Sequence, residues 1–280
     1  MKGARGQASQ FGFTLIELLV ALGIFLVITG AAFTLLGSSQ QRYRTESQVL
    51  NSFQEARLGL DQMVRDINDA GFPPPTFFIS SAPEKSASSP FAWSLSASYP
   101  NTPCQIGTGG GGNCTTAIAG DTSPGDFDII IETNPNPQTN LTVQWIRYQL
   151  VSTTLYRGTA QKVSGDDPDA DTSTQLVPFV QNVVNNVCPA QIPTCQTANP
   201  GIFGGGPVPI FTYLCDNPPV PQSPPPPTIG CPLAGANNSP ANIREVNITL
   251  IVAAPLRDAT TGQPRLVTLN GRGRRINPNQ

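Results

Sequence analysis

The chain of 280 residues contains no histidine. Histidine is the side chain most often used for proton transfer near neutral pH, so its absence excludes Ser-His-Asp and Cys-His arrangements and histidine metal sites. A hydrolase that uses two carboxylates would need no histidine, but nothing in the sequence marks one pair of acids for that role. The sequence therefore predicts a protein that is not an enzyme and that needs no cofactor.

Charge is scarce as well, since Asp, Glu, Lys and Arg make up only 12% of the residues and the formal net charge is −2. Without a basic excess, no binding of nucleic acid is expected. Turn-forming residues are abundant instead, and the 29 prolines and 26 glycines indicate long loops. The six cysteines all follow a long apolar segment near the amino terminus, as expected of disulfides in an oxidising compartment.

The apolar segment runs from Phe13 to Leu36 and contains one charged residue, Glu17. About 24 residues form roughly 36 Å of helix, which is enough to cross a bilayer with some tilt. Lys2 and Arg5 precede the segment, and positive charge on that side keeps the amino-terminal end in the cytoplasm. A charge in hydrocarbon costs roughly 2.5 kcal/mol or more, so Glu17 is a candidate functional residue whose charge a partner must offset.

Three interpretations compete for this segment. A secretory signal peptide would end in small residues such as Thr29-Gly30-Ala31, but the apolar run continues past them. A plain membrane anchor explains the length but not the glutamate. The third interpretation rests on residue order, because Gly12 stands directly before Phe13 and Glu17 is the fifth residue counted from Phe13. This order resembles the processing site of type IV prepilins and type II secretion pseudopilins, and it accounts for leader, glycine, glutamate and length together.

The resemblance implies a route for the protein. A prepilin peptidase would cleave after Gly12, and the new terminus Phe13 would be N-methylated. Glu17 would pair with the terminal amine of a neighbouring subunit as the helix leaves membrane lipid for a filament, because two desolvated charges are costly alone and tolerable together. The other expected partners are major and minor pilins and an inner-membrane assembly platform. The protein would first lie in the bacterial inner membrane with a periplasmic head, and later in a pilus or pseudopilus at the cell surface.

A second helical pattern follows Gly37. Apolar residues recur there at the three- and four-residue spacing of an amphipathic helix: Val49, Phe53, Ala56, Leu60, Met63, Ile67 and Ala70. Gly71 and Pro73-Pro74-Pro75 are expected to end this helix. A continuous helix from Phe13 to Ala70 would be roughly 87 Å long.

Beyond the prolines, the pattern changes to short β segments separated by turns. Strands are expected at 127–131, 141–150, 154–157, 210–214, 243–253 and 265–269, whereas 176–187 fits either a strand or a helix. Turns are expected at 258–263 and at Asn270-Gly271. An antiparallel sheet laid against the amphipathic helix would bury the apolar faces of both. The expected fold is therefore α+β, a pilin-like lollipop whose long amino-terminal helix packs on an antiparallel β-sheet head with long disulfide-pinned loops.

Four parts follow from this division of the chain: a leader peptide at 1–12, a transmembrane and filament-core helix at 13–37, an amphipathic helix at 38–72, and a β-rich extracytoplasmic head at 73–280. Gly23, Gly30 and Gly37 lie seven residues apart on nearly one face of the helix. Either glycine is merely tolerated in a membrane helix, or helices pack closely at this face in a filament.

Several head segments carry a narrower resemblance: Leu60–Ile67, Gly125–Asp128, Ile146–Leu150 and Ile243–Leu250. They resemble the PilW-like minor pilins and, more distantly, the minor pseudopilin J of type II secretion. The first resemblance implies a minor pilin that helps to prime or cap assembly of a type IV pilus. Two alternatives stay open, a minor pseudopilin of a type II secretion system and a membrane-anchored adhesin or ligand-binding module.

The cysteines allow fifteen connectivities, of which pairing in chain order is the simplest: Cys104–Cys114, Cys188–Cys195 and Cys215–Cys231. Each bridge would stabilise a short loop by about 3 kcal/mol in the chain-entropy model. No metal site is expected, apart from a weak calcium candidate in which Asp167, Asp169 and Asp171 occupy the first, third and fifth positions of a loop. Thr172 and Pro178 replace the glycine and the glutamate of such loops.

Overall fold

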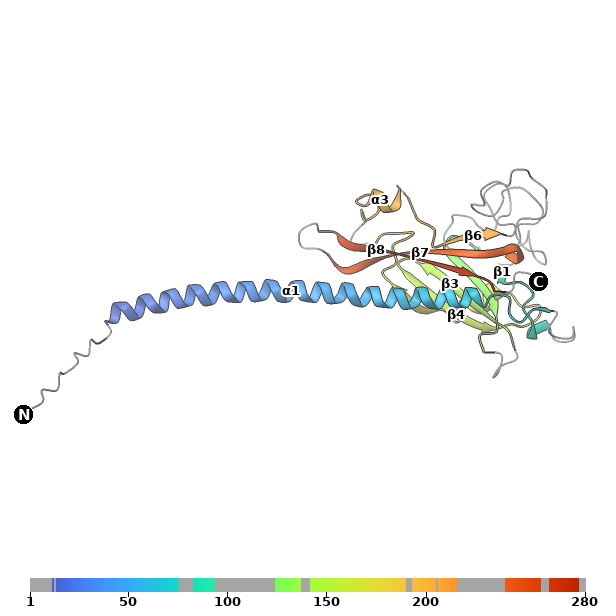
Figure 1. Ribbon diagram of the computed structural model, residues 1–280, viewed down its shortest axis with the longest axis horizontal. Coiled ribbons are helices and arrows are strands. Elements are labelled where there is room, and N and C mark those ends of the chain that lie inside the picture. Colours follow the sequence, from blue (N-terminus) through green and yellow to red (C-terminus); the bar gives the residue numbers. More distant parts are fainter. Residues whose placement is uncertain are drawn as a thin grey trace, which may run out of the picture. The chain divides into compact units, whose positions relative to one another are not determined.

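The computed structural model describes residues 12, 14–75, 83–93, 124–136, 142–189, 193–204, 206–215, 240–257 and 262–276. Within these residues, one long helix is followed by two antiparallel sheets, which is the expected α+β class (Figure 1). The chain divides into two compact units, Met1–Ser47 and Gln48–Gln280. Each unit is described by itself below.

Helix α1 spans Leu15–Asn68, close to the predicted range. In the first unit, its large apolar side chains from Leu15 to Leu36 are exposed. An 18-residue window of α1 is long and apolar enough to cross a membrane, and none of that window is buried inside the protein. Among the described residues, this part of the helix contributes nothing to a core, as expected of a segment whose neighbours are lipid or other subunits.

In the second unit, α1 supplies one side of the main core. Ala56, Met63 and Ile67 are fully buried there, in agreement with the three- and four-residue spacing of the sequence. The helix ends at Asn68, two residues before the predicted end, because the chain then tightens into turns in which the amide of Ala70 bonds to the carbonyl three residues back. Gly71 follows with a φ of 82°, a conformation that favours glycine.

The first sheet has the order β1-β2-β3-β4-β5, with antiparallel neighbours throughout. Its strands are β1 (Phe91–Ala92), β2 (Asp128–Thr133), β3 (Gln144–Val151), β4 (Thr154–Gln161) and β5 (Val177–Gln181). The strands expected at 127–131, 141–150 and 154–157 are thus confirmed to within a few residues, and the ambiguous segment 176–187 begins as a strand. Ile131, Ile146 and Tyr148 are buried in the main core, whereas Ile130 and Trp145 belong to a separate small cluster.

The second sheet has the order β6-β7-β8 and is also antiparallel. Its strands are β6 (Phe211–Cys215), β7 (Ile243–Arg257) and β8 (Pro264–Arg274). The three expected strands are confirmed, but the turn predicted at Asn270-Gly271 is wrong, because Asn270 pairs with Thr249 and β8 continues to Arg274. Gly271 has a packing reason instead, since a Cβ at this position would lie 2.6 Å from Leu60 of α1.

The two sheets are joined through the residues that follow β5. Val183 forms an antiparallel bridge with Val252 of β7, and the amide of Val184 donates to the carbonyl of Ile251. The fully buried Asn185 completes this junction, because its side chain donates to the carbonyl of Thr249 at 2.8 Å and accepts from the amide of Ile251 at 2.7 Å. A side-chain amide thereby satisfies backbone groups of β7 that no strand reaches.

Two short helices were not predicted. Helix α2 (Pro168–Ser173) lies between β4 and β5, and helix α3 (Pro200–Phe203) precedes β6. Both begin with proline, which fits the first position of a helix because its missing N–H would have had no helical partner there. In Figure 1, α3 lies to one side of β7 and β8, together with the chain that leads to it.

Candidate functional site

The amino-terminal end of α1 contains the residues that the sequence singled out. Gly12 and Glu17 are exposed, and Phe13 lies outside the described residues. The Glu17 carboxylate accepts hydrogen bonds from the backbone amide of Thr14 at 3.0 Å and from its hydroxyl at 2.9 Å. The amide of Glu17 donates in return to the Thr14 hydroxyl at 3.4 Å. These reciprocal bonds form a capping box, in which Thr14 is the N-cap and Glu17 is the third helical residue.

The capping box fixes where the carboxylate points. Because Glu17 reaches back to the amide of Thr14, its charge lies at the amino-terminal end of the helix, where the helix dipole favours an anion. The Phe13 amine that cleavage after Gly12 would create is adjacent to Thr14 in the chain. The sequence reasoning treated Glu17 as an isolated charge and missed the signal, although Thr14-Leu15-Ile16-Glu17 is the threonine-to-glutamate spacing of a capping box.

Three glycines of α1, at positions 23, 30 and 37, have no packing reason within the described residues, unlike Gly59, where a Cβ would lie 2.5 Å from Val180. A Cβ placed on Gly23, Gly30 or Gly37 would meet nothing within 4 Å. Glycine lowers the stability of a helix interior by about 1 kcal/mol relative to alanine, and no contact inside the described structure offsets this cost. The observation fits the interpretation that another helix approaches closely at this face.

A buried polar cluster ties the second half of α1 to the first sheet. The hydroxyl of Tyr148 donates to the carboxylate of Asp66 at 2.6 Å, and Arg157 donates to the same carboxylate at 3.1 Å. Gln62 donates to the other oxygen of Asp66 at 2.8 Å. Burial, followed by the nearby charge of Asp66, raises the pKa of Tyr148, so its hydroxyl stays a donor. These hydrogen bonds hold α1 in place against β3 and β4.

A second buried cluster involves Asp169, one of the three aspartates of the weak calcium candidate. Arg147, which is 1% exposed, pairs with Asp128 of β2 and with the Asp169 carboxylate, and it donates to the hydroxyl of Ser173. Asp167 caps α2 by accepting from the amide of Asp169. The acidic segment is therefore a capped helix held by an arginine rather than a calcium loop. In the part of the chain that the structure describes, no group of three acidic, histidine or cysteine side chains could hold a metal ion.

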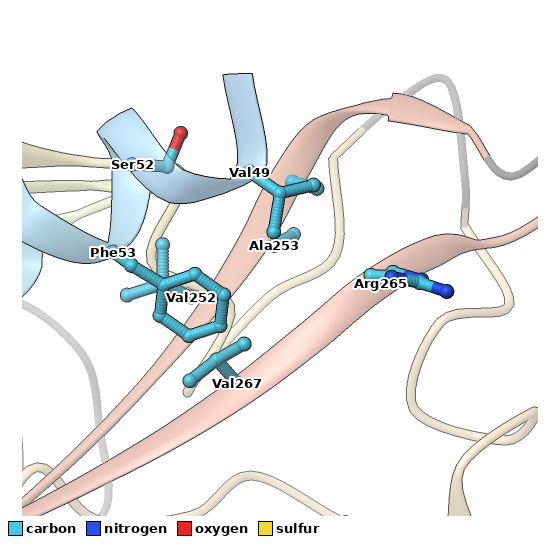
Figure 2. Close-up of a pocket in the computed structure, with 8 residues that line it drawn as sticks. Val49, Ser52, Phe53, Val252, Ala253, Arg265 and Val267 are labelled. Atoms are coloured by element: carbon cyan, nitrogen blue, oxygen red, sulfur yellow. The ribbon is translucent and has the colours of Figure 1, made fainter. Parts of the chain in front are cut away.

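A small, open apolar groove lies between α1 and the β7–β8 pair. It is lined by Val49, Ser52, Phe53, Val252, Ala253, Ala254, Arg265 and Val267. Figure 2 shows the Phe53 ring next to Val252 and Val267, with Arg265 farther along β8. The side chains that line the groove are apolar apart from Ser52 and Arg265.

Cys188 and Cys195 form a disulfide, one of the pairs expected from chain order. Cys195 is fully buried in a second apolar cluster with Phe203 of α3 and Ile251 of β7. Cys215 is also disulfide-bonded. Cys104, Cys114 and Cys231 lie outside the described residues, so the other two pairings stay predictions.

A family model, the prokaryotic N-terminal methylation motif, matches residues 7–33. The match covers residues 7–12 of the expected leader, the expected cleavage position and the first part of α1. Comparisons of the whole chain with curated proteins and with solved structures returned no match. Together with the exposed apolar helix, the motif supports a protein of the type IV pilin or pseudopilin kind that is processed by a prepilin peptidase.

Proposed function

We propose that the protein is a PilW-like minor pilin that helps to prime or cap the assembly of a type IV pilus. The observation that carries the proposal is the methylation motif at residues 7–33, on a helix whose apolar part is exposed and whose later part belongs to a folded head. Such a helix needs apolar neighbours from outside its own chain. The proposed role is assembly and not catalysis.

The proposed route has three steps. A prepilin peptidase cleaves the bond between Gly12 and Phe13, and Phe13 is then N-methylated. Before assembly, residues 13–37 span the inner membrane with the amino terminus in the cytoplasm and the head in the periplasm. On transfer to the filament, Glu17 pairs with the terminal amine of a neighbouring pilin, and the cap from Thr14 is what holds the carboxylate toward that end of the helix.

Mass spectrometry of the mature amino terminus tests this route directly. The expected result is a chain that begins with methylated Phe13. A terminus near Ala32 would instead establish an ordinary signal peptide and would overturn the proposal. An unprocessed chain that begins at Met1 would equally contradict it.

The same motif would also serve a minor pseudopilin of a type II secretion system, so the two machines need a separate test. Deletion of the gene in the native cell is the direct comparison. Loss of pili and of twitching motility with normal secretion supports the minor pilin. Loss of enzyme secretion with normal pili supports the pseudopilin.

A further inference from the structure

Strand β8 lies at the edge of the second sheet, where β7 is its one partner strand among the described residues. The amide of Arg274 points away from β7 and donates to the side-chain oxygen of Asn68 in α1 at 2.8 Å. Backbone groups alternate in direction along an antiparallel strand, so every second residue before Arg274 also directs its groups away from β7. Within the described structure these outward groups have no hydrogen-bond partner, and they belong to Leu266, Thr268, Asn270 and Arg272. We call these four residues the open edge.

The open edge lacks the usual protection of an edge strand. Natural edge strands are kept from pairing with other chains by shortness, proline or a bulge. Strand β1 has two residues, β5 contains Pro178, and β6 has five residues with a register shift. Strand β8 has 11 residues, and its pairing with β7 is regular from Leu266 to Arg274. Among the described edge strands, β8 is therefore the best suited to accept a further strand.

Helix α1 provides an apolar surface beneath such a strand. Asn68, which bonds to the amide of Arg274, marks the side of α1 that faces the open edge. Val64 lies one turn earlier on this side, and a Cβ on Gly271 would lie 3.2 Å from its side chain. Val64 is only partly buried, and Leu50, nearly four turns earlier on the same side, is 60% exposed. Apolar side chains of an added strand would cover both residues and remove apolar surface from water.

The opposite face of the open edge is basic. Because side chains alternate along a strand, Arg272 and Arg274 point away from the face on which Gly271 and Gly273 meet α1. Arg272 donates to Glu245, yet 64% of its side chain stays exposed, and Arg274 is exposed as well. A neighbouring strand with Asp or Glu at alternate positions would place carboxylates beside these arginines, and cross-strand pairs of opposite charge stabilise a sheet.

We propose that the open edge binds an extended segment of another protein, which adds a strand to the sheet and carries acidic residues on one face and apolar residues on the other. A second copy of this chain is the poorer partner, because the described edge strands β1, β5, β6 and β8 contain no Asp or Glu. Pairing of two β8 strands would also bring the arginines of both copies onto one face. The inference goes beyond the proposed function and uses only contacts within the head.

The first experiment measures binding of a defined peptide to the purified full chain in detergent. The peptide, acetyl-Thr-Glu-Val-Glu-Val-Glu-Thr-amide, alternates glutamate and valine, and its matched control has lysine in place of each glutamate. We expect the glutamate peptide to bind at least about tenfold more tightly and to slow hydrogen exchange at the amides of Thr268, Asn270 and Arg272. No binding at millimolar concentration, equal affinity of the two peptides, or unchanged exchange at these amides would overturn the proposal.

Variants of Thr268 separate strand pairing from a general attraction of charge. Thr268→Pro removes an outward amide that the bonds between β7 and β8 do not use, whereas Thr268→Val keeps it. We expect Thr268→Pro to weaken binding of the glutamate peptide by at least about tenfold, and Thr268→Val to change it by less than about twofold. Equal binding by the two folded variants would overturn the proposal.

Arg274→Glu gives the same test without a change to the backbone, so it decides the question even where Thr268→Pro fails to fold. It reverses an exposed charge, and we expect it to weaken the preference for the glutamate peptide over the lysine peptide by at least about fivefold. An unchanged preference would contradict the proposal.

The last experiment identifies the natural occupant in the native cell. A photo-cross-linking amino acid is placed at position 268 of the full chain or, as a control, at Thr159, an exposed threonine of β4. We expect cross-links from position 268 to a segment of another protein in which Asp or Glu alternates with apolar residues, and at least about fivefold fewer from position 159. Cross-links mainly to a second copy of this chain, equal cross-links from both positions, or none from position 268 would overturn the proposal.

Discussion

Glu17 combines two properties in one side chain, a hydrogen-bond acceptor that caps α1 and a negative charge available to a neighbour. Glutamine keeps the first property and loses the second, since capping boxes accept either residue. We therefore predict that Glu17→Gln is inserted and cleaved like the parent but is incorporated into filaments at least about tenfold less, because a neighbouring amine would be left unpaired in an apolar setting. Immunoblots of membrane and filament fractions measure both quantities.

Glu17→Val completes this comparison, because valine supplies neither the cap nor the charge. Equal loss of incorporation in Glu17→Gln and Glu17→Val indicates that the charge matters for assembly. Normal incorporation of Glu17→Gln, with loss only in Glu17→Val, would show that capping α1 is the whole role of Glu17. That result would remove the proposed pairing with a neighbour's amine.

Asp128 gives the head an unusual dependence on pH. Its burial outweighs the hydrogen bonds and charge of Arg147 and raises its pKa from an ordinary 3.8 to about 6. The folded state therefore holds a proton on Asp128 more tightly than the unfolded state does between these two values. In this window acidification stabilises the fold, and we predict that the free energy of unfolding rises by about 1 kcal/mol from pH 7 to pH 5.

Urea unfolding at pH 7, 6 and 5 measures this effect. Asp128→Asn removes the titrating group and should flatten the rise, although Glu132, whose pKa burial also raises, will leave part of it. A free energy of unfolding that falls from pH 7 to pH 5 would contradict the prediction. Such a fall is the usual behaviour of carboxylates whose folded pKa is lowered.

At the scale of elements, the contact between α1 and β8 depends on two glycines. A Cβ on Gly271 would lie 2.6 Å from Leu60, and a Cβ on Gly273 would lie 2.5 Å from Ile67. Both neighbours are buried side chains of α1, so a methyl group must push the helix away or force an unfavourable rotamer. We predict that Gly271→Ala and Gly273→Ala each lower the free energy of unfolding by about 1–3 kcal/mol.

Gly201→Ala is the control for these substitutions, because a Cβ at Gly201 meets nothing within 4 Å and the residue lies in helix α3. Its effect should stay within about 0.5 kcal/mol. Urea unfolding of the three variants tests the comparison. Unchanged stability of both β8 variants would mean that α1 and β8 are not in close contact.

The same glycines show where sequence reasoning succeeds and fails. The spacing of apolar residues predicted α1, and alternation with turn signals predicted β3 and β7 to within a few residues. Asn270-Gly271 was predicted as a turn because this pair favours turns locally. The absence of a side chain at Gly271 instead makes room for Leu60 of α1, which lies more than 200 residues earlier in the chain. No local sequence pattern contains that information. Helix α2 was missed for a similar reason, since Arg147 of β3 holds it in place.

The residues of the candidate site could be proposed from the sequence alone, and their roles in processing and assembly stay predictions. Gly12, Phe13 and Glu17 stand in a local motif, and a local motif is visible in sequence. The role of Thr14 was not found from the sequence, and a weak calcium candidate was kept at Asp167, Asp169 and Asp171. In the structure Asp167 caps a helix and Asp169 pairs with an arginine. Three carboxylates at alternate positions suit a calcium loop. The direction in which each side chain points depends on the fold, which the local sequence does not show.

At the scale of the whole molecule, the two units separate assembly from folding. The buried apolar residues within the described structure begin at Ala56, whereas the large apolar residues of the first unit are exposed. None of the described core residues of the head therefore belongs to the first unit. Substitutions in the first unit are therefore expected to leave the core of the head unchanged.

This separation predicts how truncation acts. A chain that begins at Gln48, exported with a cleavable signal peptide, should be soluble and should keep the Cys188–Cys195 disulfide, because the core residues of α1 from Ala56 onward are all retained. Its melting temperature should lie within about 3 °C of that of the longer chain in detergent. A chain that begins at Asp61 also lacks Ala56 and Leu60, and loss of these buried side chains should cost more than about 3 kcal/mol.

Size-exclusion chromatography and thermal unfolding of the two truncated chains provide the comparison. A monomer that begins at Gln48 with a cooperative transition, beside an aggregated or unfolded chain that begins at Asp61, is the expected result. Aggregation of both chains would show that the first unit stabilises the head. The exposed part of α1 in the first unit would then have a folding role as well as an assembly role.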